Sequence, residues 1–120
     1  MKKHNFKNLQ VWQKARVLNK EIYQITKAFP DDERFGLISQ LRRASISVMA
    51  NLAEGSGRKT AKDFGHFITM SYGSALEIES LLIASLDLGH LNDENFKQLE
   101  EQINEVQRML NGLANSIKQQ

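Results

Sequence analysis

The chain has 120 residues, a single proline and no cysteine. This length supports one hydrophobic core, so we expect one domain over residues 1–120. The missing cysteines exclude disulfides and thiolate metal sites. The N-terminal segment is basic but leads into no apolar signal segment, so we expect a soluble, cytoplasmic protein.

The net charge of +2 conceals an uneven distribution along the chain. Residues 1–60 contain 12 Lys and Arg against 5 Asp and Glu, a net charge of +7, whereas residues 61–120 contain 4 against 9, a net charge of −5. Such an asymmetry indicates either an anionic partner or oppositely charged faces that meet within an assembly. Composition alone leaves both interpretations open.

A first helix is predicted over residues 8–28. Apolar residues at helical spacing share one face of it: Val11, Ala15, Leu18, Ile22, Ile25 and Phe29. Pro30 ends the helix, because the residue before a proline is pushed out of the α region. The acidic residues at 31–33 then suit the start of the next helix, where the helix dipole favours negative charge.

The second predicted helix, over residues 33–55, is apolar on two sides. One stripe faces the expected core: Leu37, Leu41, Ala44, Val48 and Leu52. A second group lies on a different side: Ile38, Ile46, Met49 and Ala53. A bundle helix ordinarily buries about a third of its circumference, so the second group indicates burial against another subunit. Gly55 and Gly57 predict a C-terminal cap and a turn.

The third predicted helix, over residues 61–88, also has two sides, and Thr60 with Asp63 resembles a shortened capping box at its start. The core stripe is Phe64, Ile68, Ser71, Ala75, Ile78, Leu82 and Leu86. The opposite side carries Thr69, Gly73, Ser80 and Ala84, flanked by Met70, Leu76, Leu81 and Ile83. Glu77, Glu79 and the serines argue against a membrane span. Small residues allow another helix to approach closely, so a subunit interface is the natural interpretation.

Gly89 is predicted to cap the third helix, and Asn92 to begin a fourth over residues 93–118. Apolar residues alternate steps of three and four on a single face: Phe96, Leu99, Ile103, Val106, Leu110, Leu113 and Ile117. The positions around them are polar, which is typical of a helix with a solvated outer side. Four helices joined by short connections predict an all-α, antiparallel up-and-down four-helix bundle.

Two basic clusters are candidates for binding nucleic acid. The first lies on the outer side of the first helix: Arg16, Lys20, Tyr23 and Lys27. Its cations can follow a phosphate backbone and its aromatic ring can stack on a base. The second occupies the connection into the third helix, where backbone amides favour phosphate: Arg58, Lys59 and Lys62. A solvated helix face and an ordinary surface loop are the plainer alternatives.

The candidate subunit interface combines the second sides of two helices. Its residues are Ile38, Arg42, Arg43, Ile46, Met49, Glu54, Thr69, Gly73, Ser80 and Ala84. Arg43 could pair with Glu54 of its own or a neighbouring chain, and Arg42 could stretch across a subunit boundary. A partly dry ion pair there sets geometry more than it adds net stability. The sequence leaves open whether the two arginines serve assembly or a ligand.

No motif indicates catalysis. Di-iron bundles need Glu-x-x-His motifs, and none occurs, while His4, His66 and His90 are isolated along the chain. A glycine-rich phosphate loop between a strand and a helix is also missing, as is a nucleophile elbow. We therefore expect no enzymatic activity, no metal and no cofactor.

Several motifs resemble, in their order, those of a known family: Phe6…Leu9…Trp12, Phe29-Pro30, Phe35-Gly36-Leu37, Gln40-Leu41-Arg42-Arg43-Ala44, Asn51-Leu52-Ala53-Glu54-Gly55 and Gly73-Ser74…Glu77. Over nearly its whole length the chain is similar to bacterial four-helix bundle proteins encoded in intervening sequences of large-subunit ribosomal RNA genes, often labelled ribosomal-protein-like. In fold it is similar to the accessory variability determinant of diversity-generating retroelements. The resemblance implies a barrel-like homopentamer that binds structured RNA or a nucleic-acid–enzyme complex without catalysis.

The chain departs from that family pattern at one position. Many relatives have a proline before the asparagine that is Asn51 here, whereas this chain has Ala50. Because a proline bends a helix, we expect a straighter second helix in this protein.

Two functions are consistent with the sequence. The first is a homo-oligomeric module that binds RNA or a nucleoprotein, in which assembly multiplies a weak basic patch. The second is an interaction scaffold whose basic surface docks an acidic protein partner without nucleic acid. The sequence does not decide between them.

Overall fold

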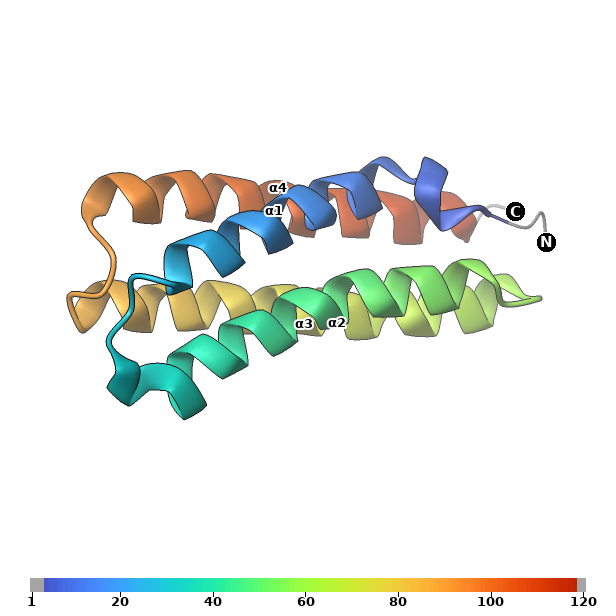
Figure 1. The fold of residues 1–120 in the computed structure, drawn as a ribbon. Helices are drawn as coiled ribbons and strands as arrows, with labels where there is room; N and C mark the ends of the chain where they lie inside the picture. The colour runs from blue at the N-terminus through green and yellow to red at the C-terminus, as the bar shows by residue number, and fades with distance from the viewer. Residues whose placement is uncertain (1–3, 119–120) are drawn as a thin grey trace.

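Four helices form an antiparallel bundle in which consecutive helices run in opposite directions (Figure 1). The computed structural model describes residues 4–118. The helices are α1 (Gln10–Thr26), α2 (Ser39–Ser56), α3 (Ala61–Asp87) and α4 (Asp93–Ile117). The all-α four-helix bundle is thus confirmed. The single domain over residues 1–120 stays a prediction, and its ends, 1–3 and 119–120, lie outside the described residues.

The bundle is elongated, with extents of 46 × 23 × 19 Å along its principal axes. Figure 1 shows α1 and α4 in one layer and α2 and α3 in the other. The α2–α3 turn lies at the same end as both chain ends, and the α1–α2 and α3–α4 connections lie at the opposite end. The α2–α3 pair makes the most extensive contact, and α1 and α4 make the least among neighbouring helices.

The core is built from the apolar face of each helix. Its largest fully buried side chains are Ile22 on α1, Leu41, Val48 and Leu52 on α2, Phe64, Ile68, Ile78 and Leu82 on α3, and Ile103, Val106, Leu110 and Ile117 on α4. The predicted stripe of α3 shifts at its end, where Leu86 is only half-buried and Ser85 is buried instead. The Ser85 hydroxyl donates a hydrogen bond to the Leu81 carbonyl at 2.8 Å, so this buried polar group has a partner.

The helix ends follow the predicted capping residues. Thr60 Oγ1 accepts a hydrogen bond from Asp63 N at 3.1 Å, and Asn92 Oδ1 accepts one from Asn95 N at 2.7 Å. Gly89 has a φ of +78°, a left-handed conformation that glycine adopts without strain. His90 N and Gly89 N donate to the carbonyls of Ser85 and Leu86, which completes a Schellman motif after α3.

The first two helices are shorter than predicted. A 3₁₀ turn, Phe6–Asn8, precedes α1, which ends at Thr26 and continues only as turns to Phe29. Residues Arg34–Ile38 form a π-helical turn, and Gly36 breaks it with φ −106° and ψ −110°. The predicted helix over 33–55 is therefore wrong at its start, because apolar spacing does not reveal this kink. From Ser39 onward α2 runs through Ala50 without interruption.

Helices α2 and α3 approach each other through small residues and hydroxyls. Ser71 Oγ donates to the Val48 carbonyl at 2.9 Å, and Ser74 Oγ donates to Ser47 Oγ at 2.8 Å. At the end of α2, Gly55 is buried, and a Cβ there would lie 2.7 Å from Cβ of Phe67. Gly57 takes the predicted C-cap position. Gly55, by contrast, is a helical residue whose missing side chain allows close packing.

Substituting Gly55 by alanine should lower the free energy of unfolding by about 1–3 kcal/mol, because the added methyl overpacks the α2–α3 contact. The matched control is Gly112→Ala, since a Cβ at Gly112 meets nothing within 4 Å. This control should raise the free energy of unfolding by about 0.5–1 kcal/mol through helix propensity. Urea denaturation followed by circular dichroism measures both. A Gly55→Ala protein as stable as the wild type would contradict this account of the contact.

Candidate nucleic-acid interface

The outer side of α1 presents three exposed cations. Because the opposite face of α1 is buried in the core, Arg16, Lys20 and Lys27 face solvent. None of the three forms an ion pair with any carboxylate in residues 4–118. Lys14, on the side toward α4, does pair with Glu105 at 3.3 Å. The predicted stripe is thus a line of uncompensated positive charge, about 16 Å from the first to the last of its α-carbons at 1.5 Å per residue.

The stripe borders a hollow between α1 and α2. This hollow, of about 520 Å³, is lined by Gln13, Arg16, Val17, Asn19, Lys20 and Met49. The Arg16 guanidinium lies 5.9 Å from the centre of the Trp12 ring. Met49, predicted to lie in a subunit interface, is half-buried beside these cations. The structure therefore joins one residue of the predicted interface to the predicted nucleic-acid surface.

Tyr23 and Arg42 form one unit between α1 and α2. The Arg42 guanidinium lies 4.6 Å from the centre of the Tyr23 ring. Arg42 Nε donates to Thr26 Oγ1 at 2.9 Å and its Nη2 donates to the Tyr23 carbonyl at 3.2 Å. Tyr23 is half-buried, so its ring is less open to a base than the predicted stacking requires. Arg42 finds these partners within its own chain.

Arg43 pairs across the α2–α3 contact. Its Nη2 lies 2.6 Å from Glu77 Oε2. The predicted pairing with Glu54 of the same chain is wrong, because Arg43 pairs with Glu77 and Glu54 lies 3.8 Å from Arg58 instead. Arg43 is exposed, so a contact with a neighbouring chain stays a prediction.

The second basic cluster surrounds the turn between α2 and α3. The Arg58 guanidinium lies 4.5 Å from the centre of the Phe67 ring, which orients it. Lys59 and Lys62 are exposed and have no ion-pair partner in the described part of the chain. Arg16 is in the half of α1 nearer this turn, whereas Lys27 follows the opposite end of α1 (Figure 1).

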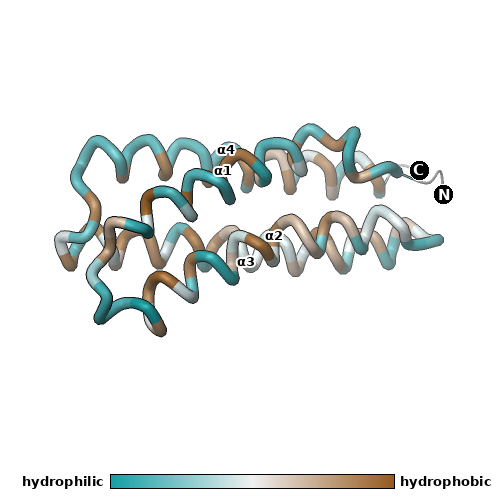
Figure 2. The backbone as a smooth tube through the Cα atoms, in the orientation of Figure 1, coloured by the Kyte–Doolittle hydropathy of each residue, from teal (hydrophilic) through white to brown (hydrophobic). Residues whose placement is uncertain are grey.

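The outer sides of α2 and α3 are unusually apolar. Ile46 is 45% exposed, and Leu76 and Ile83 are 44% and 43% exposed. Figure 2 shows α4 mostly hydrophilic, whereas α2 and α3 contain long neutral and hydrophobic stretches. Among the predicted interface residues, the exposed ones are Arg43, Ile46, Glu54, Thr69, Gly73 and Ser80, and the half-buried ones are Ile38, Arg42, Met49 and Ala84.

Within residues 4–118, no helix combines the length and the apolar character needed to cross a membrane.

The family model for the 23S rRNA-intervening sequence protein matches residues 7–112. The chain belongs to this family. A crystal structure of a protein with unknown function from the S23 ribosomal protein family of Bacteroides thetaiotaomicron is similar, with a TM-score of 0.78 and 19% sequence identity. The match covers 87% of this chain and 97% of that one, and it shows a shared fold. No curated protein matches the sequence.

In this member of the intervening sequence protein family, the sequence patterns did not predict the placement of two aromatic residues. One is exposed, and the other lies against a basic side chain. Phe35 is 87% exposed on the π-helical turn, and Phe67 lies against Arg58. Phe35 precedes the Gly36 break, so helical spacing does not predict which way it points. For Phe67 the sequence held no such signal, because Phe67 falls close to Gly55 only once α2 and α3 are packed together.

The two adjacent arginines should differ in their effect on stability. Arg42→Met removes two hydrogen bonds from a charged donor, so it should lower the free energy of unfolding by about 1.5–3 kcal/mol. Arg43→Met breaks an exposed ion pair and should lower it by less than about 1 kcal/mol. Urea denaturation at one fixed protein concentration measures both. Equal losses would show that Arg42 does not hold α1 against α2 as described.

Proposed function

We propose that this protein is a non-enzymatic, self-associating bundle that binds structured RNA through the basic side of α1. The observation that carries the proposal is the line of exposed, unpaired cations at Arg16, Lys20 and Lys27. Phosphate contacts from such cations supply most of the affinity of sequence-independent nucleic-acid binding. The chain belongs to the 23S rRNA-intervening sequence protein family, and this membership supports RNA as the polyanion. It also supports the cytoplasm as the place of binding.

The basic turn would extend this surface. Arg58 is oriented by Phe67, and Lys59 and Lys62 point to solvent beside the first turn of α3. Backbone amides at a helix N-terminus favour phosphate groups. In an oligomer, the α1 stripes and the turns of several copies would act together, and this repetition raises the affinity of a weak patch.

Self-association is the second part of the proposal. Exposed apolar residues on the outer sides of α2 and α3, among them Ile46, Leu76 and Ile83, support burial against further copies. The small residues Gly73 and Ser80 between them would let a neighbouring helix approach. The expected assembly is the homopentamer that the family resemblance implies.

Replacing Arg16, Lys20 and Lys27 together by glutamine should weaken binding to a labelled 23S rRNA fragment. It should also lower the slope of log affinity against log salt by about 2–3, because each lost phosphate contact removes about 0.7–0.9. Fluorescence anisotropy at several KCl concentrations measures both quantities.

The matched control for this variant carries the same change in charge on another surface. Lys97, Arg108 and Lys118 are exposed on or just after α4, and their joint replacement by glutamine should leave the salt slope nearly unchanged. Equal losses in both triple variants would mean that net charge alone attracts the RNA. No binding by the wild type at low salt would contradict the proposal outright and favour an acidic protein partner.

Gly73→Glu should dissociate the assembly without unfolding the bundle. A Cβ at Gly73 meets nothing within 4 Å inside one chain, and the position is exposed, so the monomer should tolerate the substitution, whereas a charge in an apolar interface is unfavourable. Light scattering at micromolar concentration measures the mass, and circular dichroism checks the fold. Gly112→Glu, also at an open helical position, should keep the wild-type mass. A monomeric wild type would contradict self-association.

A further inference from the structure

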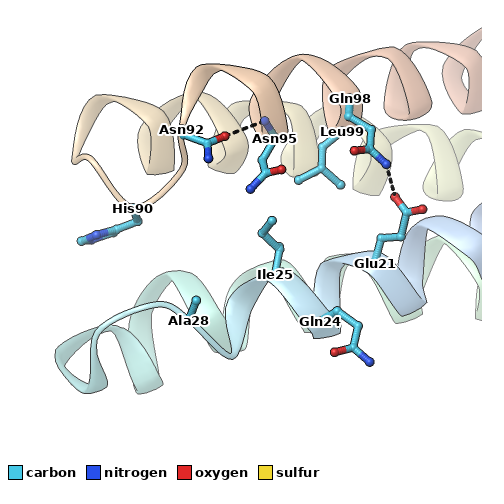
Figure 3. Close-up of a pocket in the computed structure, with 9 residues that line it drawn as sticks. All are labelled: Glu21, Gln24, Ile25, Ala28, His90, Asn92, Asn95, Gln98 and Leu99. Carbon is cyan, nitrogen blue, oxygen red and sulfur yellow. Dashed lines mark hydrogen bonds between the residues drawn. The ribbon is translucent and has the colours of Figure 1, made fainter.

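A groove of about 600 Å³ opens between α1 and α4 (Figure 3). Its volume falls in the range of about 300–1,000 Å³ typical of small-molecule sites. Ile25 and Leu99 extend into it from the two helices, and amide side chains surround them. The full lining is Glu21, Gln24, Ile25, Ala28, His90, Asn92, Asn95, Gln98 and Leu99.

The groove exists because α1 diverges from α4. Figure 1 shows α1 next to α4 near the chain termini and progressively farther from it toward the opposite end. At that opposite end, Arg42 on α2 donates to Thr26 and to the Tyr23 carbonyl and so holds α1 against α2. The last turns of α1 and the first turns of α4 are left without close packing between them.

Contacts between two connecting segments form the far wall of the groove. His90 Nε2 lies 3.1 Å from Glu33 Oε2, and the His90 ring lies 5.5 Å from the Phe29 ring, centre to centre. These contacts tie the α3–α4 connection to the α1–α2 connection. Asn92 is also occupied, because its side chain caps α4 at Asn95 N.

The remaining polar groups are available to a ligand. The Asn95 amide points into the space above Ile25 (Figure 3) and has no hydrogen-bond partner in residues 4–118. Gln98 Nε2 reaches Glu21 Oε2 only at 3.5 Å, the longest kind of hydrogen bond. No Lys or Arg is among the lining residues that the structure describes. The groove therefore suits a neutral ligand with hydrogen-bond donors and not a phosphate, which Glu21 would repel.

We propose that this groove binds one unpaired nucleobase that carries an exocyclic amino group: adenine, cytosine or guanine. This inference rests on the proposed RNA binding and adds a base-reading site to it. Lys20 and Lys27 lie four residues before and three residues after Gln24 on α1, so both neighbour the groove's rim. The phosphates of an RNA strand along the α1 stripe thus place an unstacked base next to the opening.

The chemistry of the rim sets the preference among bases. The Glu21 carboxylate only accepts hydrogen bonds, so it pairs well with an exocyclic amino group. Uracil offers it only the N3–H, which lies between two carbonyl oxygens that the carboxylate repels. The Asn95 and Gln98 amides can both donate and accept, which is the pattern that reads a base edge in RNA loops. Half-buried Ile25 contacts the face of the base, and Leu99, only 3% exposed, closes the apolar floor that excludes water from these hydrogen bonds.

The test is a nuclear magnetic resonance titration of the full-length protein with the nucleosides cytidine, adenosine and uridine. Saturable shifts should appear at the side-chain amides of Asn95 and Gln98 and at the methyl groups of Ile25 and Leu99. Cytidine and adenosine should bind about tenfold more tightly than uridine, the factor that one hydrogen bond to a charged group supports. Nucleosides carry no phosphate, so the α1 cations do not contribute to this measurement.

Three variants identify the groups involved. Asn95→Ala should abolish the shifts, and the fold should persist because the cap uses the Asn95 backbone. Glu21→Gln adds a donor of the same shape, so the preference for cytidine over uridine should fall to about one. Asn111→Ala removes an exposed asparagine elsewhere on α4 and should leave nucleoside binding unchanged.

The outcomes separate this inference from the proposed function. If nucleosides shift no groove resonance, or if Asn95→Ala binds cytidine as the wild type does, the groove is not a base site, although RNA binding by α1 can still hold. Uridine binding as tight as cytidine binding would also overturn the assignment. If RNA affinity does not depend on Arg16, Lys20 and Lys27, the proposed function fails, and the inference that rests on it fails too.

Discussion

The close approach of α2 and α3 is the constraint on which the rest of the structure depends. At Gly55 even one added carbon would lie 2.7 Å from Phe67, and serine hydroxyls bond to the facing helix at Ser71 and Ser74. Dispersion attraction falls steeply once a gap opens between apolar surfaces, so the small residues favour close contact in this pair, which makes the most extensive contact in the bundle. The pair forms a platform on which α1 and α4 lie.

The α2–α3 platform positions residues of both the candidate nucleic-acid surface and the candidate self-association surface. Its turn places Arg58 against Phe67, and its outer sides carry the small and apolar residues proposed for self-association. Its inner edge binds α1 through Arg42, whose hydrogen bonds end at Thr26 and Tyr23. Because α1 is drawn toward α2 at one end, the groove opens between α1 and α4, beside the exposed cations of α1. One arginine thus relates the stripe proposed to bind phosphates to the groove proposed to bind a base.

The bundle places the opposite charges of the two halves of the chain in different environments. The cations of the first half are exposed along α1 and at the α2–α3 turn, while two carboxylates of the second half pair within the chain, in Lys14–Glu105 and Arg43–Glu77. Internal pairing consumes little of the α1 charge, since Arg16, Lys20 and Lys27 have no carboxylate partner in residues 4–118. A basic surface therefore persists on a protein of nearly balanced net charge.

The sequence by itself determined the helices, their inward faces and their caps, because apolar spacing and residues such as Thr60, Asn92 and Gly89 act within one or two turns. It also indicated the basic stripe, which depends only on the period of α1. Tertiary structure alone decided the partners of Arg42 and Arg43, the close-packing role of Gly55 and the groove at Asn95. Each of these depends on which helices meet and how far apart they lie, and the spacing of residues along one helix carries no such information.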